Sequence, residues 1–327
     1  MADRQLSLFM FIFWIAVAVF VLVEGLLIYS VIRFRHRPEQ SGLPPQIHGN
    51  TRLEIIWTII PVFILAAIAI PTYITIVDQN SPPEGESITV EVTGHQWWWE
   101  FYYPEEGIYT ATEMHIPVGR VVNIKLFSTD VVHSFWVPKL AGKLDVFPGQ
   151  IREMWFIADN EGTFFGLCAE LCGIAHALMR LRVVAESPDE YDKWVRGQQQ
   201  PPPQPEGLAA EGAQVFLTKG CLVCHTNTGP DAPGVQQARA AGFEAGGATF
   251  AAPNLTYIAT RETFAGGIID LTPRNLGRWL RDPEAIKPGN RMSQLAGAYT
   301  DPNLRLSNDD IDALVAYFMS RKPEPVS

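Results

Sequence analysis

Two long apolar runs dominate the first 80 residues of the chain. The first contains no charged residue over 5–23 and continues past Glu24 as far as Ile32, and the second covers 55–77 without a charge. Each run is long enough to cross the roughly 30 Å hydrocarbon layer of a bilayer as a helix. Two buried helices of a soluble protein are the alternative, but two such runs so close together argue against it. We therefore predict a transmembrane helical hairpin over residues 1–79.

The segment between the two runs is short and basic. The positive-inside rule places such a loop in the cytoplasm and both chain ends outside, so residues from about 80 onward would face the periplasm or the cell exterior. A cleaved signal peptide is the alternative for the first run, but the run is too long and no small-residue cleavage site follows it. The loop and its borders carry Arg33, Arg35, His36, Arg37, His48 and Arg52.

Two carboxyl groups lie in or beside the predicted spans. Glu24 falls inside the first span, where a carboxyl group is costly and usually functional or packed against a partner helix. Glu54 precedes the second span, where an exposed acid at a helix N-terminus is the simplest interpretation. The sequence leaves the role of Glu24 open.

The middle of the chain shows the period-two alternation of β-strands. Side chains alternate over 87–93, 121–126 and 179–184, and turns that contain proline and glycine punctuate this region. Short alternating strands with such turns predict an antiparallel, all-β sandwich or barrel over residues 80–196. The stretch 94–101 holds three consecutive tryptophans, and as a strand it would leave at least one indole near the surface.

A Gln/Pro-rich segment over residues 197–206 separates this sandwich from the last third of the chain. Polyproline of this length is semi-rigid and spans roughly 30 Å at about 3.1 Å per residue, so we expect a linker between two folded units. Residues 207–327 show helical apolar periodicity, most clearly before Met319, where Ser307 and Asp310 have capping-box spacing. We expect an all-α domain there.

Charge and cysteine content narrow the function classes. The formal net charge is −10, which argues against nucleic acid as a partner. Residues 80–200 carry nine basic and seventeen acidic side chains, against eleven and thirteen in residues 201–327, so the middle of the chain holds most of the negative charge. The four cysteines form two close pairs, and such pairs make poor long-range disulfides.

The first cysteine pair belongs to a cluster of sulfur and nitrogen ligands, for which three interpretations compete. A disulfide would need neither the histidines nor the methionine of the cluster. Zinc suits the count of two cysteines and two histidines but has little use for a thioether. Copper fits best, because thiolate and thioether ligands select it, and two thiolates with two imidazoles suit two sulfur-bridged coppers. The candidate ligands are His133, Cys168, Cys172, His176 and Met179.

The second cysteine pair carries the signature of covalent haem attachment. Cys221 and Cys224 are followed directly by His225, so the thiols would add to the haem vinyl groups and the imidazole would bind the iron. Zinc would need two further ligands, and the last third of the chain has no other cysteine or histidine. Met292 and Met319 remain as sixth ligand. We favour Met292, because it lies in a predicted loop that can reach over the haem, and a methionine ligand raises the haem potential.

The copper-type loop has a specific pattern. The motif Cys-x-Glu-x-Cys-Gly-x-x-His-x-x-Met begins at Cys168, and a Gly-His-Gln-Trp stretch ends at Trp97. Over roughly residues 1–196 these features resemble subunit II of the haem-copper cytochrome c oxidases. The resemblance implies a cupredoxin-like domain with a dinuclear CuA centre, to which the candidate ligands and the backbone carbonyl of Glu170 bind. It also implies that the Glu170 side chain reaches a magnesium ion at the subunit I interface, that electrons enter at Trp97, and that Glu54 opens a proton channel.

The last third resembles a small class I cytochrome c. An N-terminal helix near Phe216, the Ala-Pro-Asn-Leu turn at 252–255 and the terminal helix carry this resemblance beside the haem motif. The chain departs from the cytochrome c pattern at two places. Ser293 follows Met292 where proline is common, and the segment 226–251 is longer than the usual loop after the haem motif.

A haem c domain fused to a CuA subunit resembles the caa-type oxidases. This resemblance implies a multi-pass protein of a bacterial plasma membrane that relays electrons to subunit I, coupled to proton translocation. It implies subunits I and III and membrane lipid as partners. The electron donor would be a cytochrome c, another periplasmic carrier or a quinol-oxidising complex.

Other functions share parts of this pattern. A quinol oxidase subunit II would have the fold without the copper ligands, which argues against it. Nitrous oxide reductase carries CuA but is soluble and needs a second, histidine-rich cluster. A CuA-bearing subunit of a nitric oxide reductase, or a membrane-tethered electron carrier, stays open, because the partner subunit decides which gas is reduced.

Overall fold

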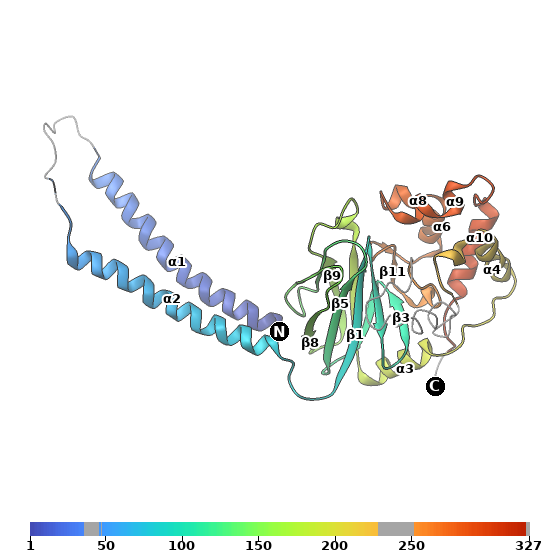
Figure 1. Ribbon diagram of the computed structural model, residues 1–327, viewed down its shortest axis with the longest axis horizontal. Helices are drawn as coiled ribbons and strands as arrows, with labels where there is room; N and C mark the ends of the chain where they lie inside the picture. Colours follow the sequence, from blue (N-terminus) through green and yellow to red (C-terminus); the bar gives the residue numbers. More distant parts are fainter. Residues whose placement is uncertain (36–45, 47, 228–251, 325–327) are drawn as a thin grey trace. The chain divides into compact units, whose positions relative to one another are not determined.

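The protein forms two compact units, Met1–Ser81 and Pro82–Ser327, in the computed structural model (Figure 1). The first unit is a helical hairpin, and the second holds a β-sandwich followed by a helical domain. The predicted fold class is therefore confirmed. The predicted basic residues His36 and Arg37 lie outside the described residues, as does most of the long segment after the haem motif. The structure describes residues 1–35, 46, 48–227 and 252–324.

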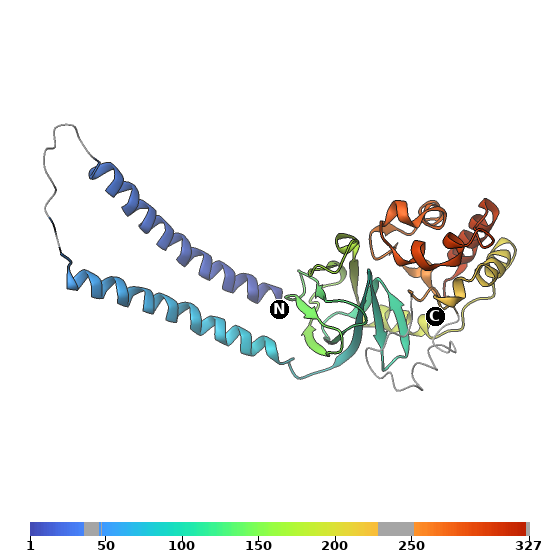
Figure 2. The same ribbon diagram turned by 45° about the horizontal axis from the view of Figure 1, so that its top comes forward.

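The hairpin consists of α1 (Ala2–Arg33) and α2 (Thr51–Asn80), which run alongside each other in two views (Figures 1 and 2). Asn50 caps α2, since its side-chain oxygen accepts hydrogen bonds from the backbone amides of Arg52 and Leu53 at 3.1 and 3.3 Å. Both helices are long and apolar enough to cross a membrane, and neither contains a buried residue. The predicted pair of apolar helices is confirmed.

The sandwich consists of two five-stranded sheets, with strand orders β3-β2-β1-β5-β8 and β4-β10-β9-β6-β7. β1 pairs in parallel with β5, and β4 in parallel with β10. The expectation of a purely antiparallel sandwich is wrong for these two pairs, because the chain changes sheets at β4, and such crossovers allow parallel pairing. The strands are β1 (Ser87–His95), β2 (Trp98–Tyr103), β3 (Ile108–Ala111), β4 (Glu113–Pro117), β5 (Val121–Ser128), β6 (His133–Trp136), β7 (Leu144–Val146), β8 (Arg152–Phe156), β9 (Gly162–Cys168) and β10 (Arg180–Glu186).

The three consecutive tryptophans do not lie on one strand. β1 ends at His95 and β2 begins at Trp98, so Trp97 belongs to the turn between them. The prediction that one indole stays near the surface is wrong, since Trp97 and Trp98 are each 8% exposed and Trp99 is fully buried. The ring of His95 stacks on Trp98 and covers it, with 4.2 Å between the ring centroids. Trp97 is contacted from the C-terminal domain, where Lys287 donates a hydrogen bond to its carbonyl oxygen.

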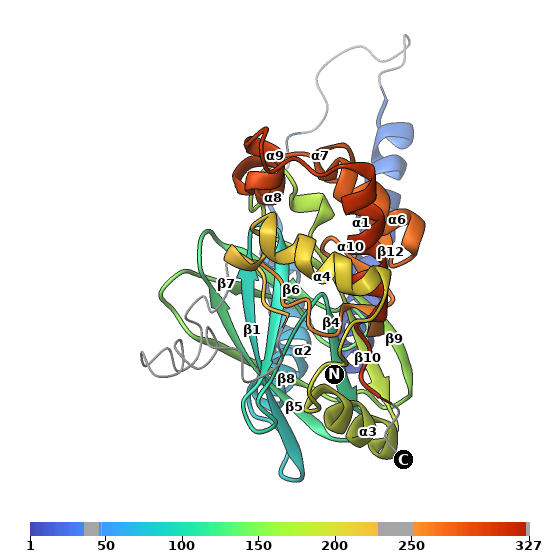
Figure 3. The ribbon, with the colours of Figure 1, turned by 90° about the vertical axis from the view of Figure 1, so that its right-hand side faces the viewer.

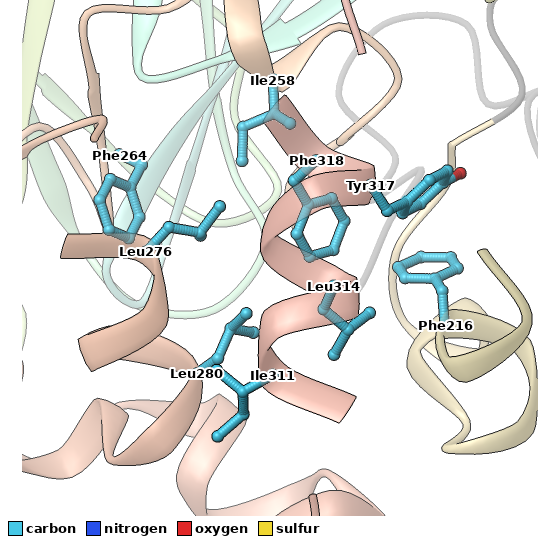
Figure 4. Close-up of a cluster of buried hydrophobic side chains, with 9 residues drawn as sticks. All are labelled: Phe216, Ile258, Phe264, Leu276, Leu280, Ile311, Leu314, Tyr317 and Phe318. Atoms are coloured by element: carbon cyan, nitrogen blue, oxygen red, sulfur yellow. The ribbon is translucent and has the colours of Figure 1, made fainter. Parts of the chain in front are cut away.

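The C-terminal domain packs its helices around an apolar cluster drawn from both ends of the domain (Figure 4). Helices α4 and α10 lie side by side in Figure 3 and cross so closely that a Cβ on Gly212 would lie 2.0 Å from the carbonyl oxygen of Ala313. The predicted capping box of Ser307 and Asp310 begins α10. A small β-hairpin, β11 with β12, adds to the predicted helices. The elements are α4 (Leu208–Thr218), η2 (Cys221–Val223), η3 (Ile258–Thr260), β11 (Thr263–Phe264), β12 (Ile269–Asp270), α6 (Pro273–Arg281), α7 (Pro283–Ile286), α8 (Arg291–Leu295), α9 (Gly297–Thr300) and α10 (Asn308–Ser320).

The segment between the sandwich and the C-terminal domain lies against folded structure. Helix α3 (Pro188–Gln198) follows the last strand of the sandwich. The Tyr257 hydroxyl then donates to the backbone carbonyl of Gln200, and the Arg321 guanidinium donates to that of Pro203 at 3.2 Å. The sandwich and the C-terminal domain thus belong to one compact unit, although the sequence suggested two units held apart by a spacer.

Candidate copper and haem sites

The five candidate copper ligands converge at one end of the sandwich. His133 opens β6, Cys168 closes β9, and the loop that follows leads through η1 (His176–Leu178) to Met179. The sulfur atoms of Cys168 and Cys172 are 3.8 Å apart, and both cysteines are free. The Nδ1 atom of His133 lies 3.9 Å from the Cys168 sulfur, and the Nδ1 atom of His176 lies 3.6 Å from the Cys172 sulfur. The arrangement gives each cysteine a histidine of its own.

Two weaker donors complete the set. The Met179 sulfur is 3.9 Å from the Cys172 sulfur, and the backbone carbonyl oxygen of Glu170 is 3.3 Å from the Cys168 sulfur. Cys168, Cys172, His133 and Met179 are all at most 2% exposed. Two thiols, two imidazoles, a thioether and a carbonyl in a largely buried cluster suit a pair of soft copper ions better than one tetrahedral zinc ion.

Trp97 and Gln96 hold the backbone of the copper-type loop. The indole Nε1 of Trp97 and the amide Nε2 of Gln96 both donate to the carbonyl oxygen of Cys172, at 3.0 and 2.8 Å. Gly173 has a φ of +119°, and a Cβ on it would lie 3.0 Å from the Trp97 ring. Glycine at this position therefore allows the loop to pass directly beneath the indole.

Asp130 orients His133. Its carboxylate accepts a hydrogen bond from the Nε2 atom of His133 at 2.8 Å, which leaves Nδ1 facing Cys168. It also accepts from the backbone amides of Val131 and Gln96, each at 2.7 Å. Burial opposes the charge, but these hydrogen bonds hold the pKa of Asp130 below its usual value. Burial likewise works against a charged His133 ring, yet the contacts with Asp130 and Cys168 raise the pKa of His133.

The two thiols do not ionise independently. A hydrogen bond from the Cys172 thiol lowers the pKa of Cys168 to about 3. The same contact raises the pKa of Cys172, because a second negative charge beside the first is unfavourable. One proton is therefore lost easily, whereas the other stays until a cation replaces it.

The Glu170 side chain remains close to its own loop. Its Oε1 atom accepts a hydrogen bond from the backbone amide of Leu171 at 3.1 Å, and the residue is half-buried. Leu171 and Ile174, on the same loop, are 76% and 80% exposed. A carboxylate beside exposed apolar side chains is free to face a partner subunit.

The haem-attachment motif folds as predicted into a compact turn. Cys221 begins the short helix η2 and Cys224 directly follows it, and both cysteines are free and half-buried. The Nδ1 atom of His225 donates to the carbonyl oxygen of Pro253 at 2.8 Å, since a carbonyl can only accept. Desolvation lowers the pKa of His225, so the ring is neutral and its Nε2 atom is available to bind a metal ion.

Met292 lies in the first turn of α8 rather than in the predicted loop. The loop prediction is wrong because Asn290 caps a short helix here, with its side chain accepting from the Ser293 amide at 2.9 Å. Met292 and Cys221 both pack against the apolar cluster of the domain, so a haem on Cys221 would share a wall with Met292. Met319 packs against the same cluster from the terminal helix, as expected.

The two membrane carboxylates lie on different helices. Glu54 is in the first turn of α2 and is exposed. Glu24 lines a groove between α1 and α2 whose eight other lining residues are apolar.

Sequence reasoning missed several residues that organise the site, among them Asp130, Gln96 and Gly173. Asp130 stands three residues before His133, and no pattern in the sequence distinguishes it from the other acids of the sandwich. Gly173 falls inside the copper-type motif, but its closeness to Trp97 depends on how two loops fold together.

The fold and the two sites together define a class: a membrane-anchored redox subunit with one metal-binding sandwich and one haem-binding domain. Comparison with protein families agrees with each part. Residues 1–74 match the transmembrane domain of cytochrome c oxidase subunit II, residues 108–187 match its periplasmic domain, and residues 209–322 match cytochrome c.

Relatives with similar sequences extend over most of the chain. Cytochrome c oxidase subunit 2 of Alkalihalophilus pseudofirmus is 39% identical over 92% of this chain and 82% of its own length. The same subunit of Bacillus sp. PS3 is 37% identical over 89% of this chain and 80% of its own length. Quinol oxidase subunit 2 of Bacillus cereus is 36% identical, over 62% of this chain and 72% of its own length.

The chain belongs to the cytochrome c oxidase subunit II family, with a cytochrome c domain at its C-terminal end. It is a component of an oxidoreductase complex that includes a subunit I. The matched domains imply binding of copper and haem c, and they imply a membrane protein with a periplasmic domain.

Proposed function

We propose that this chain is the electron-accepting subunit of a caa-type cytochrome c oxidase in a bacterial plasma membrane. It receives electrons from a cytochrome c, another periplasmic carrier or a quinol-oxidising complex and delivers them to the oxygen-reducing centre of subunit I, with coupled proton translocation. The observation that carries the proposal is the presence of a copper-type ligand cluster and a haem-attachment motif in one compact unit.

In this proposal the ligand cluster holds the dinuclear CuA centre. The chain's own residues orient the ligands and exclude water: Asp130 fixes the His133 ring, and Trp97 with Gln96 fixes the carbonyl of Cys172. Copper and haem, when bound, supply reversible one-electron redox chemistry. The copper ligands are His133, Cys168, the carbonyl of Glu170, Cys172, His176 and Met179.

The C-terminal domain holds haem c in the same proposal. Cys221 and Cys224 provide the two thioether links, and His225 and Met292 provide the axial ligands. The carbonyl of Pro253 keeps the His225 ring in the tautomer that leaves Nε2 free, which supports the ligand assignment.

Three further roles concern the contacts with other subunits. Trp97 accepts electrons at the copper loop. The Glu170 side chain shares a magnesium ion with subunit I, beside the exposed apolar residues of its loop. Glu54, at the start of the second membrane helix, opens a proton channel into subunit I, and subunit III completes the core of the complex.

The experiment that tests the function uses the purified complex with its natural partner subunits. It should consume oxygen with an artificial reductant and no added soluble cytochrome. Cys172→Ser should abolish the near-infrared copper band and the activity while leaving the haem c spectrum, and Cys224→Ser should alter the haem c spectrum while leaving the copper band. Reduction of nitric oxide in place of oxygen would overturn the assignment as an oxidase.

A further inference from the structure

The sandwich and the haem domain meet through buried polar contacts. Glu113, at the start of β4, is only 2% exposed, and its carboxylate accepts hydrogen bonds from the haem domain. The donors are the amides of Glu262 and Thr263, at 3.0 and 2.7 Å, and the Thr263 hydroxyl at 2.8 Å. A buried carboxylate is tolerated only with such donors, so this contact stabilises one docked arrangement of the two domains.

Lys287 makes the reciprocal contact, from the haem domain to the sandwich. It follows α7, is 3% exposed, and its amine nitrogen Nζ donates to the carbonyl oxygens of Trp97 at 2.6 Å and Ala265 at 2.8 Å. Within the part of the chain that the structure describes, Lys287 forms no ion pair. A lysine amine buried without a carboxylate is costly, so the two carbonyls are what keep it in this position.

Gly266 provides the space that this contact requires. Its φ is +81°, and a Cβ on it would lie 2.5 Å from the Lys287 nitrogen and 2.8 Å from the Trp97 carbonyl oxygen. The turn after β11 therefore closes around the amine and the carbonyl together. Arg180 adds a backbone hydrogen bond across the same boundary, donating to the Gly266 carbonyl at 2.8 Å.

The lysine contact leads directly to the copper loop and to the favoured haem ligand. The Trp97 residue whose carbonyl accepts from Lys287 donates through its indole to the carbonyl of Cys172 at 3.0 Å. Arg291, the residue before Met292, donates to the Gln96 side chain at 2.6 Å. The short segment before Met292 thus contacts the turn that supports the copper loop at two adjacent residues.

We propose that Lys287 is the positioning residue for electron transfer between the haem domain and the copper loop. By fixing the backbone of Trp97, it keeps the haem-ligand segment and the copper loop in one geometry. The two domains then need no encounter step before transfer, although a proline-rich segment joins them. This inference rests on the proposed function and adds to it the residue that holds the domains in register.

The test is flash photoreduction of haem c in the complete oxidase complex, with the absorbance of haem c and of copper followed over time. Lys287→Met keeps the length and apolar stem of the side chain but removes the donors. It should slow haem-to-copper transfer by about 10- to 100-fold, as small displacements of reacting groups do. Lys287→Gln, which keeps a donor, should recover part of the rate.

Two readouts separate positioning from a general loss of structure. Transfer in the wild-type complex should not depend on solvent viscosity, whereas in Lys287→Met it should, because the domains must first dock again. The haem c and copper spectra, and the later transfer from copper to subunit I, should stay unchanged. The matched control is Lys219→Met, whose amine contacts Arg305 and Asp310 within the haem domain and which should transfer at the wild-type rate.

A rate in Lys287→Met within twofold of wild type, or a slowed rate accompanied by a changed copper spectrum, would overturn the positioning role. If this variant does not assemble, Gly266→Ala displaces the same amine without removing it and must slow transfer in the same way. A wild-type complex that passes no electron from haem to copper would overturn the proposed function itself, and the positioning role with it.

Discussion

The Asp130 carboxylate accepts a hydrogen bond from Nε2 of His133, with 2.8 Å between the nitrogen and Oδ1. This contact turns the other ring nitrogen of His133 toward Cys168. The same carboxylate accepts a hydrogen bond from the backbone amide of Gln96, the residue before Trp97. One acid therefore connects a candidate copper ligand with the turn that supports the copper loop.

Replacing this acid should weaken copper binding. In Asp130→Asn one oxygen becomes a donor that cannot accept from the amides, and the charge opposite His133 is lost. We expect copper affinity to fall about 10- to 100-fold, as measured by competition with a copper chelator. The exposed acid Asp159 offers a matched control, since Asp159→Asn makes the same charge change at the surface of the same domain. Equal affinities in the two variants would contradict the role given to Asp130.

Copper binding should depend on pH through the shared thiol proton. The pKa of Cys172 is raised, so its proton is still bound at neutral pH, whereas Cys168, with a pKa of about 3, has already lost its own. A copper ion that takes both sulfurs must displace the Cys172 proton, so affinity should rise with pH between pH 6 and 8, by about tenfold per unit for one proton. Calorimetry in two buffers of different ionisation enthalpy measures the proton release. An affinity that does not change with pH would exclude the shared proton.

The sixth haem ligand can be tested by exchange. Met292→His replaces a thioether with an imidazole, which should lower the haem potential by a large margin. Met319 packs against the same apolar cluster, so Met319→Leu is the matched control and should leave the potential near that of the wild type. A redox titration of the haem c band measures both. A normal potential in Met292→His together with a shifted one in Met319→Leu would reverse the assignment.

Local patterns in the sequence predicted the elements and the ligand candidates. The apolar runs, the alternating strands and the capping box at Ser307 each depend on residues close together in the chain. The same holds for the Cys-x-x-Cys-His turn, whose spacing alone brings Cys221, Cys224 and His225 together.

Contacts between distant segments could not be predicted in this way. Nothing in the local sequence distinguishes Lys287 from a surface lysine, because its burial depends on the turn at Gly266 and on the carbonyl of Trp97. The burial of Trp97 depends in part on the docked haem domain, that of Trp98 and Trp99 on packing within the sandwich, and the helix around Met292 on a local cap. Tertiary contacts decide these features, and the proline-rich linker does not indicate that the sandwich and the haem domain dock.

The close crossing of α4 and α10 should make the stability of the haem domain sensitive to substitution of Gly212. Gly212→Ala would place a methyl group 2.0 Å from the carbonyl oxygen of Ala313, so the helices must move apart. We expect a loss of about 1–3 kcal/mol in the free energy of unfolding of the haem domain. Gly277, within α6, has more room, since a Cβ on it would lie 3.7 Å from the Val315 side chain. Gly277→Ala should therefore be neutral or stabilising by up to about 1 kcal/mol. Chemical denaturation followed by haem absorbance compares the two variants. Equal losses of stability would contradict the close packing of Gly212 against Ala313.

We expect this one membrane-anchored chain to carry both a dinuclear copper centre and a covalently bound haem. The decisive experiment determines the metal and haem content of the purified chain, with copper and zinc measured by elemental analysis and haem by a pyridine haemochrome assay after denaturation and extraction. We expect two copper ions and one covalently attached haem per chain. Zinc in place of copper, or haem that is removed by acid-acetone extraction, would contradict this expectation.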